Sequence, residues 1–243
     1  MNIRTFIFTY SGDQDLILGK IENSLWAFPG MPIHVIDDKK SPMSYKVVDQ
    51  IRKLGNVTYE LSNFNRMGNL NGSACIKEEL SIFTKYAKFN EIIIKTDPDA
   101  LFISKQLADF ITKGIGFLSC QVIDHVFSGY FYAMNTDVLS FVYRWLMPNN
   151  SILKSAPEDA TIGATACACA LMLGYRNDTI FDGLHNGRAD TFDYSVPKDK
   201  EDLIVERICE GAYLMYLGVH GVEKNEVVRI QRKILDKLKE VKE

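Results

Sequence analysis

The sequence has 243 residues, of which 47% are hydrophobic and 24% charged. These proportions are close to globular averages, so they exclude a mostly disordered chain and supply enough apolar side chains for one large α/β core. A net charge of -3 argues against a generally basic surface for binding nucleic acid. The apolar stretch at the N-terminus is too short for a signal sequence or a membrane span, so we expect a cytoplasmic protein. The five cysteines lack the spacing of a zinc site and are expected to be reduced thiols.

Short apolar runs alternate with helical patterns along the chain. Runs that are apolar on both faces predict buried strands at 5–10, 33–36, 91–95, 116–120 and 129–134. Helical spacing predicts helices at 16–27, 45–54 and 73–86, and a run of small residues predicts another at 158–173 that ends at Gly174. This alternation predicts one α/β domain with a mostly parallel central sheet and helices on both faces.

Two later segments have patterns of their own. Residues 225–243 place apolar side chains at helical spacing among nearly balanced charges, which predicts an amphipathic helix docked on the domain. Binding of this helix to a membrane surface is the alternative. Residues 176–200 are polar and without clear periodicity, so we expect a functional loop there.

Two carboxylates follow the predicted strand at 91–95. Asp97 and Asp99 flank Pro98, and side chains two positions apart in an extended chain point to the same side. Since Pro98 has no N–H to donate, the acids should lie where the strand leaves the sheet, at the edge where open α/β sheets bind ligands. There they could hold Mn²⁺ or Mg²⁺ against a diphosphate. The alternative is a strand-end turn in which both acids are solvated.

A further acid lies at the predicted start of the helix 158–173. Ser155 and Glu158 match a capping box with Pro157 in the first turn, which accounts for Glu158 and leaves Asp159 unexplained. A carboxylate at this place could accept the proton of an acceptor hydroxyl or amine. We expect Asp159 to be a catalytic base, with a capping or solvated acid as the alternative.

His220 and Lys224 follow a short apolar stretch near the C-terminus. Imidazole suits Mn²⁺, and the lysine could reach a phosphate as a point charge. We expect His220 to complete the metal shell. A structural histidine is the alternative, and His185 is a competing metal ligand.

The order of these segments resembles that of a known enzyme family. The chain carries K-T-D-P-D at 95–99, S-G-Y at 128–130 and E-D at 158–159, followed by Gly163 and by Leu173-Gly174. Over about the middle third of the chain this is similar to the inverting β-1,3-galactosyltransferase and Fringe-like group of GT-A glycosyltransferases, with K-T-D-D-D, S-G-x-G-Y and E-D-V-x-x-G segments. Pro98 replaces the middle acid of the first segment, and Phe131 and its neighbours replace part of the second.

The resemblance implies a GT-A (Rossmann-like) fold and a nucleotide-diphosphate sugar as donor, with a UDP-sugar as the first expectation. It implies Asp97, Asp99 and His220 as metal ligands and Asp159 as the base, with Ser128 and Gly129 beside the sugar and the acceptor. Strand ends and polar loops add further expected contacts to the donor, namely Thr9, Tyr10, Asp37, Arg66, Lys95 and Lys224. For Asp37 an ordinary polar turn is the alternative.

Within a single domain of residues 1–243, we expect 1–120 to bind the nucleotide sugar, 121–224 to hold the acceptor and the catalytic groups, and 225–243 to form the C-terminal helix. The acceptor stays open among a glycan, a lipid-linked glycan, a protein and a modified DNA base. Two other functions stay open as well: a nucleotidyltransferase that makes a nucleotide sugar, and a non-catalytic module that binds one.

Overall fold

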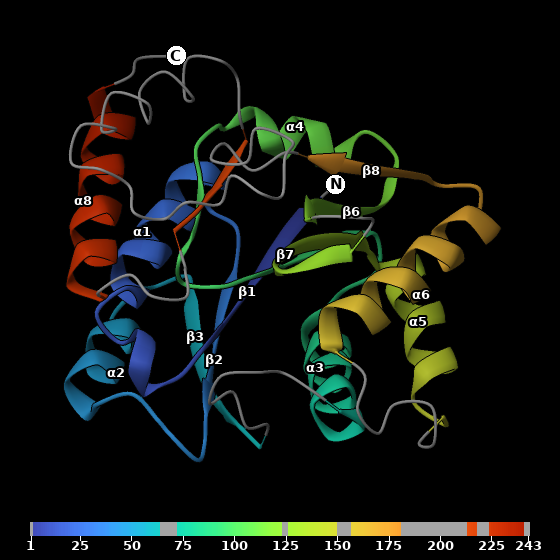
Figure 1. Cartoon of the computed structure of the whole chain (residues 1–243), viewed down its shortest axis with the longest axis horizontal. Helices are drawn as coiled ribbons and strands as arrows, with labels where there is room; N and C mark the ends of the chain where they lie inside the picture. The colour runs from blue at the N-terminus through green and yellow to red at the C-terminus, as the bar shows by residue number, and fades with distance from the viewer. Residues whose placement is uncertain are drawn as a thin grey trace.

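Figure 1 shows the computed structural model, which describes residues 2–63, 72–122, 126–149, 157–180, 213–217 and 224–240. Within these residues, seven strands form one mixed sheet in the order β3-β2-β1-β4-β7-β6-β8. A smaller sheet pairs β5 (Ala100–Phe102) with β9 (Leu214–Tyr216) in antiparallel fashion. The strands of the large sheet are β1 (Asn2–Thr9), β2 (Ile33–Asp38), β3 (Val57–Ser62), β4 (Glu91–Thr96), β6 (Ile115–Val122), β7 (Val126–Asn135) and β8 (Arg176–Ile180).

The sheet is mostly parallel, as the sequence predicts. Strand β1 pairs in parallel with β2 and β4, β2 with β3, and β6 with β8. Strand β7 runs antiparallel to both of its neighbours, β4 and β6. The start of β7 therefore lies at the same edge of the sheet as the carboxyl ends of β1, β2 and β4, and this edge is the place where open α/β sheets bind ligands.

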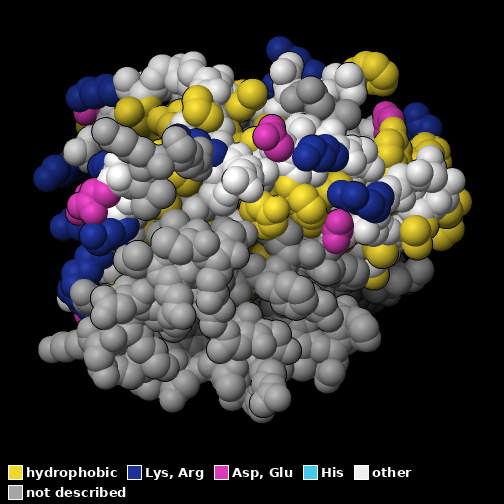
Figure 2. Space-filling model, turned by 90° about the horizontal axis from the view of Figure 1, so that it is seen from above, with side chains coloured by type: hydrophobic (Ala, Val, Ile, Leu, Met, Phe, Trp, Pro, Cys, Tyr) yellow, Lys and Arg dark blue, Asp and Glu magenta, His cyan; other side chains and the backbone are white. Residues whose placement is uncertain are grey.

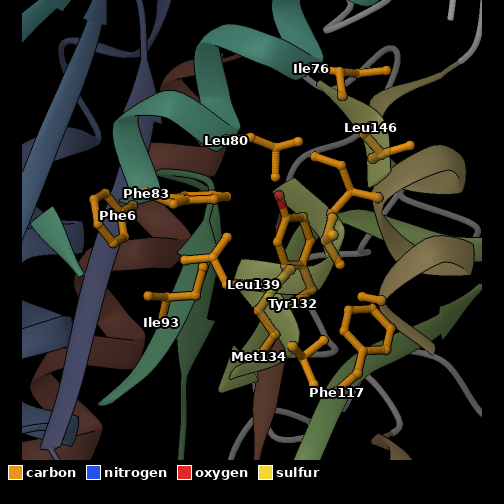
Figure 3. Close-up of a cluster of buried hydrophobic side chains, with 14 of the residues drawn as sticks. Phe6, Ile76, Leu80, Phe83, Ile93, Phe117, Tyr132, Met134, Leu139 and Leu146 are labelled. Carbon is orange, nitrogen blue, oxygen red and sulfur yellow. The ribbon is translucent and has the colours of Figure 1, made fainter. Parts of the chain in front are cut away.

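Helices cover both faces of the sheet (Figure 1). Phe6 and Phe8 of β1 pack in one apolar cluster with α3, α5 and α6, whereas Ile7 packs in another with α1 and α2. This alternation follows from the pleat, which points successive side chains to opposite faces. Figure 3 shows the first cluster, in which Phe6, Ile93 and Tyr132 from the sheet lie with Leu80 and Phe83 of α3. The helices of the described part are α1 (Ile17–Ala27), α2 (Tyr45–Arg52), α3 (Ser73–Tyr86), α4 (Gln106–Thr112), α5 (Thr136–Leu146), α6 (Glu158–Met172) and α8 (Lys224–Glu240), with a 3-10 turn at Ser11–Asp13.

The C-terminal helix is docked as predicted. Its apolar stripe, including Ile230, Ile234 and Leu238, is buried in a cluster with Leu16 and Leu101. Because this stripe faces the domain, it does not face outward for contact with lipid. Figure 2 shows Lys and Arg side chains gathered at the left of the view, the side on which α8 lies in Figure 1, and α8 exposes Arg232, Lys233, Lys237 and Lys239.

The sequence patterns miss some elements. The prediction of a loop from residue 176 is wrong for Arg176–Ile180, which form β8, since a polar strand at the edge of a sheet lacks the apolar run of a buried one. The remainder of that predicted loop, 181–200, lies outside the described residues. Gly174 ends α6 with a positive φ of 77°, as expected of a helix C-cap. In the described part, no helix is both long enough and apolar enough to cross a membrane.

Candidate active site

The turn after β4 carries Asp97 and Asp99, which we call the acid pair. The N–H of Asp97 donates to the carbonyl oxygen of Tyr130 on β7 (3.0 Å), and the N–H of Ala100 donates to the carbonyl oxygen of Asp97 (3.2 Å). The N–H of Leu217, next to β9, donates to the carbonyl oxygen of Asp99 (2.8 Å). Each of these bonds holds the backbone of the turn, while both acidic side chains remain partly exposed.

The far side of the turn is held by α8. Pro98 is buried, and its carbonyl oxygen accepts a hydrogen bond from Nε2 of Gln231 (3.2 Å). The same nitrogen donates to the carbonyl oxygen of Leu16 (3.1 Å), at the start of α1. The side chain of Gln231 therefore ties the acid-pair turn to α1.

Lys95 is buried directly beside Asp97. Its ammonium group lies 3.0 Å from Oδ1 of Asp97 and also donates to the carbonyl oxygen of Gly129. The side chain is 1% exposed. A buried ammonium group is costly unless it is paired, so these contacts fix Lys95 and orient the carboxylate of Asp97.

Lys20, on α1, supplies a second buried ammonium group. It donates to the carbonyl oxygen of Ala100, the residue after Asp99, and lies 3.7 Å from the ring centroid of Phe102. Burial lowers the pKa of Lys20 well below its usual value, and the negative charges of Asp99 and Asp97 oppose that shift. The charges of both carboxylates of the acid pair therefore act on the same buried ammonium group.

Asp159 lies beside the start of β7. It is half-buried at the first turn of α6, and a Cβ atom placed on Gly129 would lie 3.2 Å from its Oδ2 atom. Since the carbonyl group of Gly129 binds Lys95, and Lys95 pairs with Asp97, the start of β7 connects Asp159 to the acid pair. The structure thus brings together four of the predicted site residues: Asp97, Lys95, Gly129 and Asp159.

The capping-box interpretation of Glu158 is wrong. Helix α6 begins at Glu158 with Pro157 as its N-cap residue, so Glu158 does not hold the third helical position that a capping box requires. A first-turn N–H, that of Ala160, donates to Oδ1 of Asp159 (2.7 Å), which is the capping contact expected as the alternative to a catalytic role for Asp159. Glu158 is instead 4% exposed and faces the interior. The spacing of Ser155 and Glu158 matches a capping box by sequence alone, although the side chain of Glu158 is used in the interior.

The ends of β1 and β2 hold the residues predicted to contact the nucleotide. Oδ2 of Asp37 accepts hydrogen bonds from the N–H of Met43 (2.9 Å) and the hydroxyl of Tyr59 (2.6 Å). Burial raises the pKa of Asp37, and these hydrogen bonds oppose the rise. Thr9 is fully buried, and its hydroxyl donates to the sulfur of Met43 (3.8 Å). Both predicted residues therefore stabilise the loop after β2.

Tyr10 and Lys224 lie next to each other at the same edge. The ammonium group of Lys224 is 5.6 Å from the ring centroid of Tyr10 and 3.1 Å from Oδ1 of Asp13. The side chain of Lys224 is 40% exposed, so it can reach a ligand at this edge. The start of α8 is thereby placed beside the end of β1.

Some predicted residues lie outside the described part, namely Arg66, His185 and His220. For Ser128, only the backbone is described, and it lies in β7 directly before Gly129. Among the described residues, no three or more His, Cys, Asp or Glu side chains are arranged to hold a metal ion. The acid pair offers carboxylate oxygens, the ligand type that suits Mn²⁺ or Mg²⁺, and its role as a metal site stays a prediction.

Sequence reasoning missed three buried polar residues that support the site: Lys20, Glu79 and Gln231. Each lies on the apolar side of an amphipathic helix, between residues such as Ile17 and Ile21 in the case of Lys20. A charged or amide side chain at a helix position that the pattern assigns to the core is a usable signal, because such a group needs a specific partner there.

Comparisons with solved structures show the fold. The galactosyltransferase LgtC, in complex with donor and acceptor sugar analogues, matches with a TM-score of 0.55 at 12% identity over 98% of each chain. The bifunctional glycosyltransferase WbbM matches with a TM-score of 0.54 at 11% identity over 98% of this chain and 51% of WbbM. A mannosyltransferase from Pyrobaculum calidifontis, in complex with GDP-mannose and Mn²⁺, gives a TM-score of 0.48 at 15% identity over 98% of this chain and 73% of that one.

The matches to LgtC and WbbM show that the predicted GT-A fold is correct. No protein-family model and no curated protein matches the sequence. The placement in the Fringe-like group rests on the sequence segments alone and stays a prediction.

Proposed function

We propose that this chain is a cation-dependent glycosyltransferase that moves a sugar from a nucleoside-diphosphate donor to an acceptor hydroxyl group. The observation that carries the proposal is the acid pair, held at the ligand-binding edge of the sheet and connected through Lys95 and Gly129 to Asp159. The GT-A fold supports it, since LgtC has this fold and was solved with donor and acceptor sugar analogues.

Asp97 and Asp99 would hold the cation, with His220 as a further ligand. A bound Mn²⁺ or Mg²⁺ ion neutralises negative charge on the diphosphate leaving group. Lys95 keeps the carboxylate of Asp97 in one orientation, because its own position is fixed by the carbonyl group of Gly129. Because the carboxylate of Asp97 is already oriented, it does not need to rearrange when the donor binds.

The nucleotide would lie over the ends of β1 and β2, with a UDP-sugar as the first donor to test. Tyr10 and Lys224 are partly exposed there, and Lys224 is suited to a phosphate oxygen. Thr9 and Asp37 would act mainly by shaping the loop after β2, and Arg66 would add a phosphate contact.

Asp159 would be the base of a single displacement. The acceptor oxygen bonds to the anomeric carbon while the bond from that carbon to the diphosphate oxygen breaks, and the hydroxyl proton passes to Asp159. This reaction inverts the anomeric configuration. The acceptor would lie against residues of the 121–224 half, and a glycan, a lipid-linked glycan, a protein and a modified DNA base are the classes to screen.

The proposal is tested by incubating the protein with Mn²⁺ and a panel of UDP- and GDP-sugars and measuring nucleoside diphosphate release by mass spectrometry. Asp97→Asn or Asp99→Asn should lower donor turnover about a hundredfold or more, and a chelator should abolish it. Asp49→Asn, on the exposed side of α2, is the matched control. Turnover that persists in chelator with either acid replaced would overturn the proposal.

Two further measurements separate the alternative functions. A nucleotidyltransferase would release pyrophosphate from a nucleoside triphosphate and a sugar phosphate. A non-catalytic module would show a shift of the melting temperature with nucleoside diphosphate and cation, but no donor turnover.

A further inference from the structure

Two buried glutamates, Glu79 and Glu158, lie near Lys95, the residue that contacts Asp97 of the acid pair. Glu79 on α3 is 1% exposed and Glu158 on α6 is 4% exposed. The hydroxyl group of Tyr132 on β7 donates to Oε1 of Glu79, and Glu158 lies beside this hydroxyl, whose pKa is raised by burial, by Glu79 and by Glu158. Figure 3 shows this hydroxyl pointing from β7 toward Leu80 of α3, inside the apolar cluster. Three elements of the fold thus meet at one pair of carboxyl groups.

The carboxyl groups of Glu79 and Glu158 lie close enough to form a hydrogen bond when one of them is protonated. Neither can donate unless it is protonated, and two ionised carboxylates in contact in a dry interior repel strongly. Within the described part of the chain, no group donates to Oε2 of Glu79 or to Oε1 of Glu158. Burial raises the pKa of both groups, most strongly that of Glu158, which the charge of Glu79 raises further. One proton held between the two satisfies both the geometry and the charge.

The positive charge that faces this glutamate pair is that of Lys95, which favours the ionised form of both residues. Lys95 in turn contacts Asp97 and the carbonyl oxygen of Gly129. Glu158 directly precedes Asp159, so a contact that fixes Glu158 against Tyr132 also fixes the turn that carries Asp159.

We propose that Glu79 and Glu158 form a pair with one proton and one negative charge that positions the start of α6 and thereby holds Asp159 against Gly129. Both are positioning residues that act through Tyr132 and Lys95. The effect on catalysis rests on the proposed function, whereas the protonation of the pair does not.

The test compares glutamine and alanine variants. Glu79→Gln or Glu158→Gln replaces the shared proton by an amide N–H and leaves one carboxylate opposite Lys95, so kcat should stay within about twofold of wild type and the melting temperature should not fall. The double glutamine variant removes the negative charge opposite Lys95 and should melt at a lower temperature. Glu158→Ala should lower kcat about tenfold or more, with the KM for the donor unchanged, because Asp159 loses its fixed position.

An infrared spectrum supplies a readout that does not depend on turnover. The carbonyl band of a protonated carboxylic acid should be present in the wild-type protein at neutral pH and absent from each single glutamine variant. Glu22→Gln, at an exposed position of α1, is the control and should keep the band.

Absence of the band from the wild-type protein would overturn the inference, as would an equal loss of kcat in Glu158→Gln and Glu158→Ala. If no donor is turned over at all, the proposed function fails, while the band and the melting temperatures still decide whether the pair shares a proton.

Discussion

The carboxylate of Asp159 packs directly against Gly129. A Cβ atom at residue 129 would lie 3.2 Å from Oδ2 and 3.3 Å from Cβ of Asp159, tighter than most such contacts between real side chains. Gly129 in β7 is also the residue whose carbonyl group binds Lys95. The absence of a side chain at residue 129 therefore lets α6 approach the strand that adjoins the acid pair.

Gly129→Ala should displace Asp159 by a few tenths of an ångström. If Asp159 is the base, kcat for transfer should fall about tenfold, since misplacement of a catalytic group is costly, while the free energy of unfolding should change by only about 1 kcal/mol. The measurements are steady-state kinetics with Mn²⁺ and donor, and urea unfolding.

Gly55→Ala is the control for the Gly129 variant, because a Cβ atom at residue 55 would have nothing within 4 Å. Wild-type kcat in Gly129→Ala would contradict a catalytic role for Asp159 at its observed position.

Lys20→Met should strengthen cation binding in the absence of nucleotide. The ammonium group of Lys20 lies near both carboxylates of the acid pair, and its removal makes the local potential more negative. We expect the affinity for Mn²⁺ alone, measured by electron paramagnetic resonance of the free ion, to rise about tenfold.

Lys113→Met removes an exposed lysine and should leave this affinity unchanged. An unchanged affinity in Lys20→Met would show that Lys20 does not act on the acid pair.

The sequence predicts the central strands well because they are buried on both faces. Residues 33–36 and 91–95 are mostly apolar, with Val35-Ile36 and Ile92-Ile93-Ile94 as their cores, and they lie inside β2 and β4. Strand β3, at the edge of the sheet, is buried only at its first and last residues, Val57 and Ser62, so it has no such run. Helix α5 (Thr136–Leu146) is also missed, although Asn135 caps its start by accepting a hydrogen bond from the N–H of Val138 (2.8 Å).

The site is predictable only where its residues are close in sequence. Asp97 and Asp99 can be predicted as site residues from their spacing and from the strand that precedes them. The contacts of Lys20 with Ala100 and of Glu79 with Tyr132 join residues on different elements, and the sequence pattern holds no information on which elements come together. The interior position of Glu158 could not be predicted for the same reason.

His34 should make the fold sensitive to acid. It is 3% exposed and lies between Arg4 (Nη1–Nε2, 2.8 Å) and Thr58 (Nδ1–Oγ1, 2.6 Å). Since Arg4 can only donate, Nε2 accepts and the neutral ring carries its proton on Nδ1. Burial, followed by the charge of Arg4, lowers the pKa of His34 to about 4.

In the unfolded chain the pKa of His34 is near 6.5, whereas in the folded protein it is about 4. The contribution of His34 to stability is therefore complete above pH 6.5 and is lost as the pH falls to 4, by roughly 3 kcal/mol. Urea unfolding of His34→Gln across this range should show a shallower loss of stability than the wild type. Parallel pH curves for the two proteins would contradict this prediction.

The central claim is that Asp97 and Asp99 hold one divalent cation together with a nucleoside diphosphate. The most direct measurement is a titration of Mn²⁺ into the protein with UDP, and in parallel with GDP, followed by electron paramagnetic resonance, for the wild type and for the Asp97→Asn/Asp99→Asn variant checked for an unchanged melting temperature. We predict one bound Mn²⁺ ion per wild-type chain in the presence of nucleotide and none in the variant. An equal number of ions bound with equal affinity in both proteins would contradict the account.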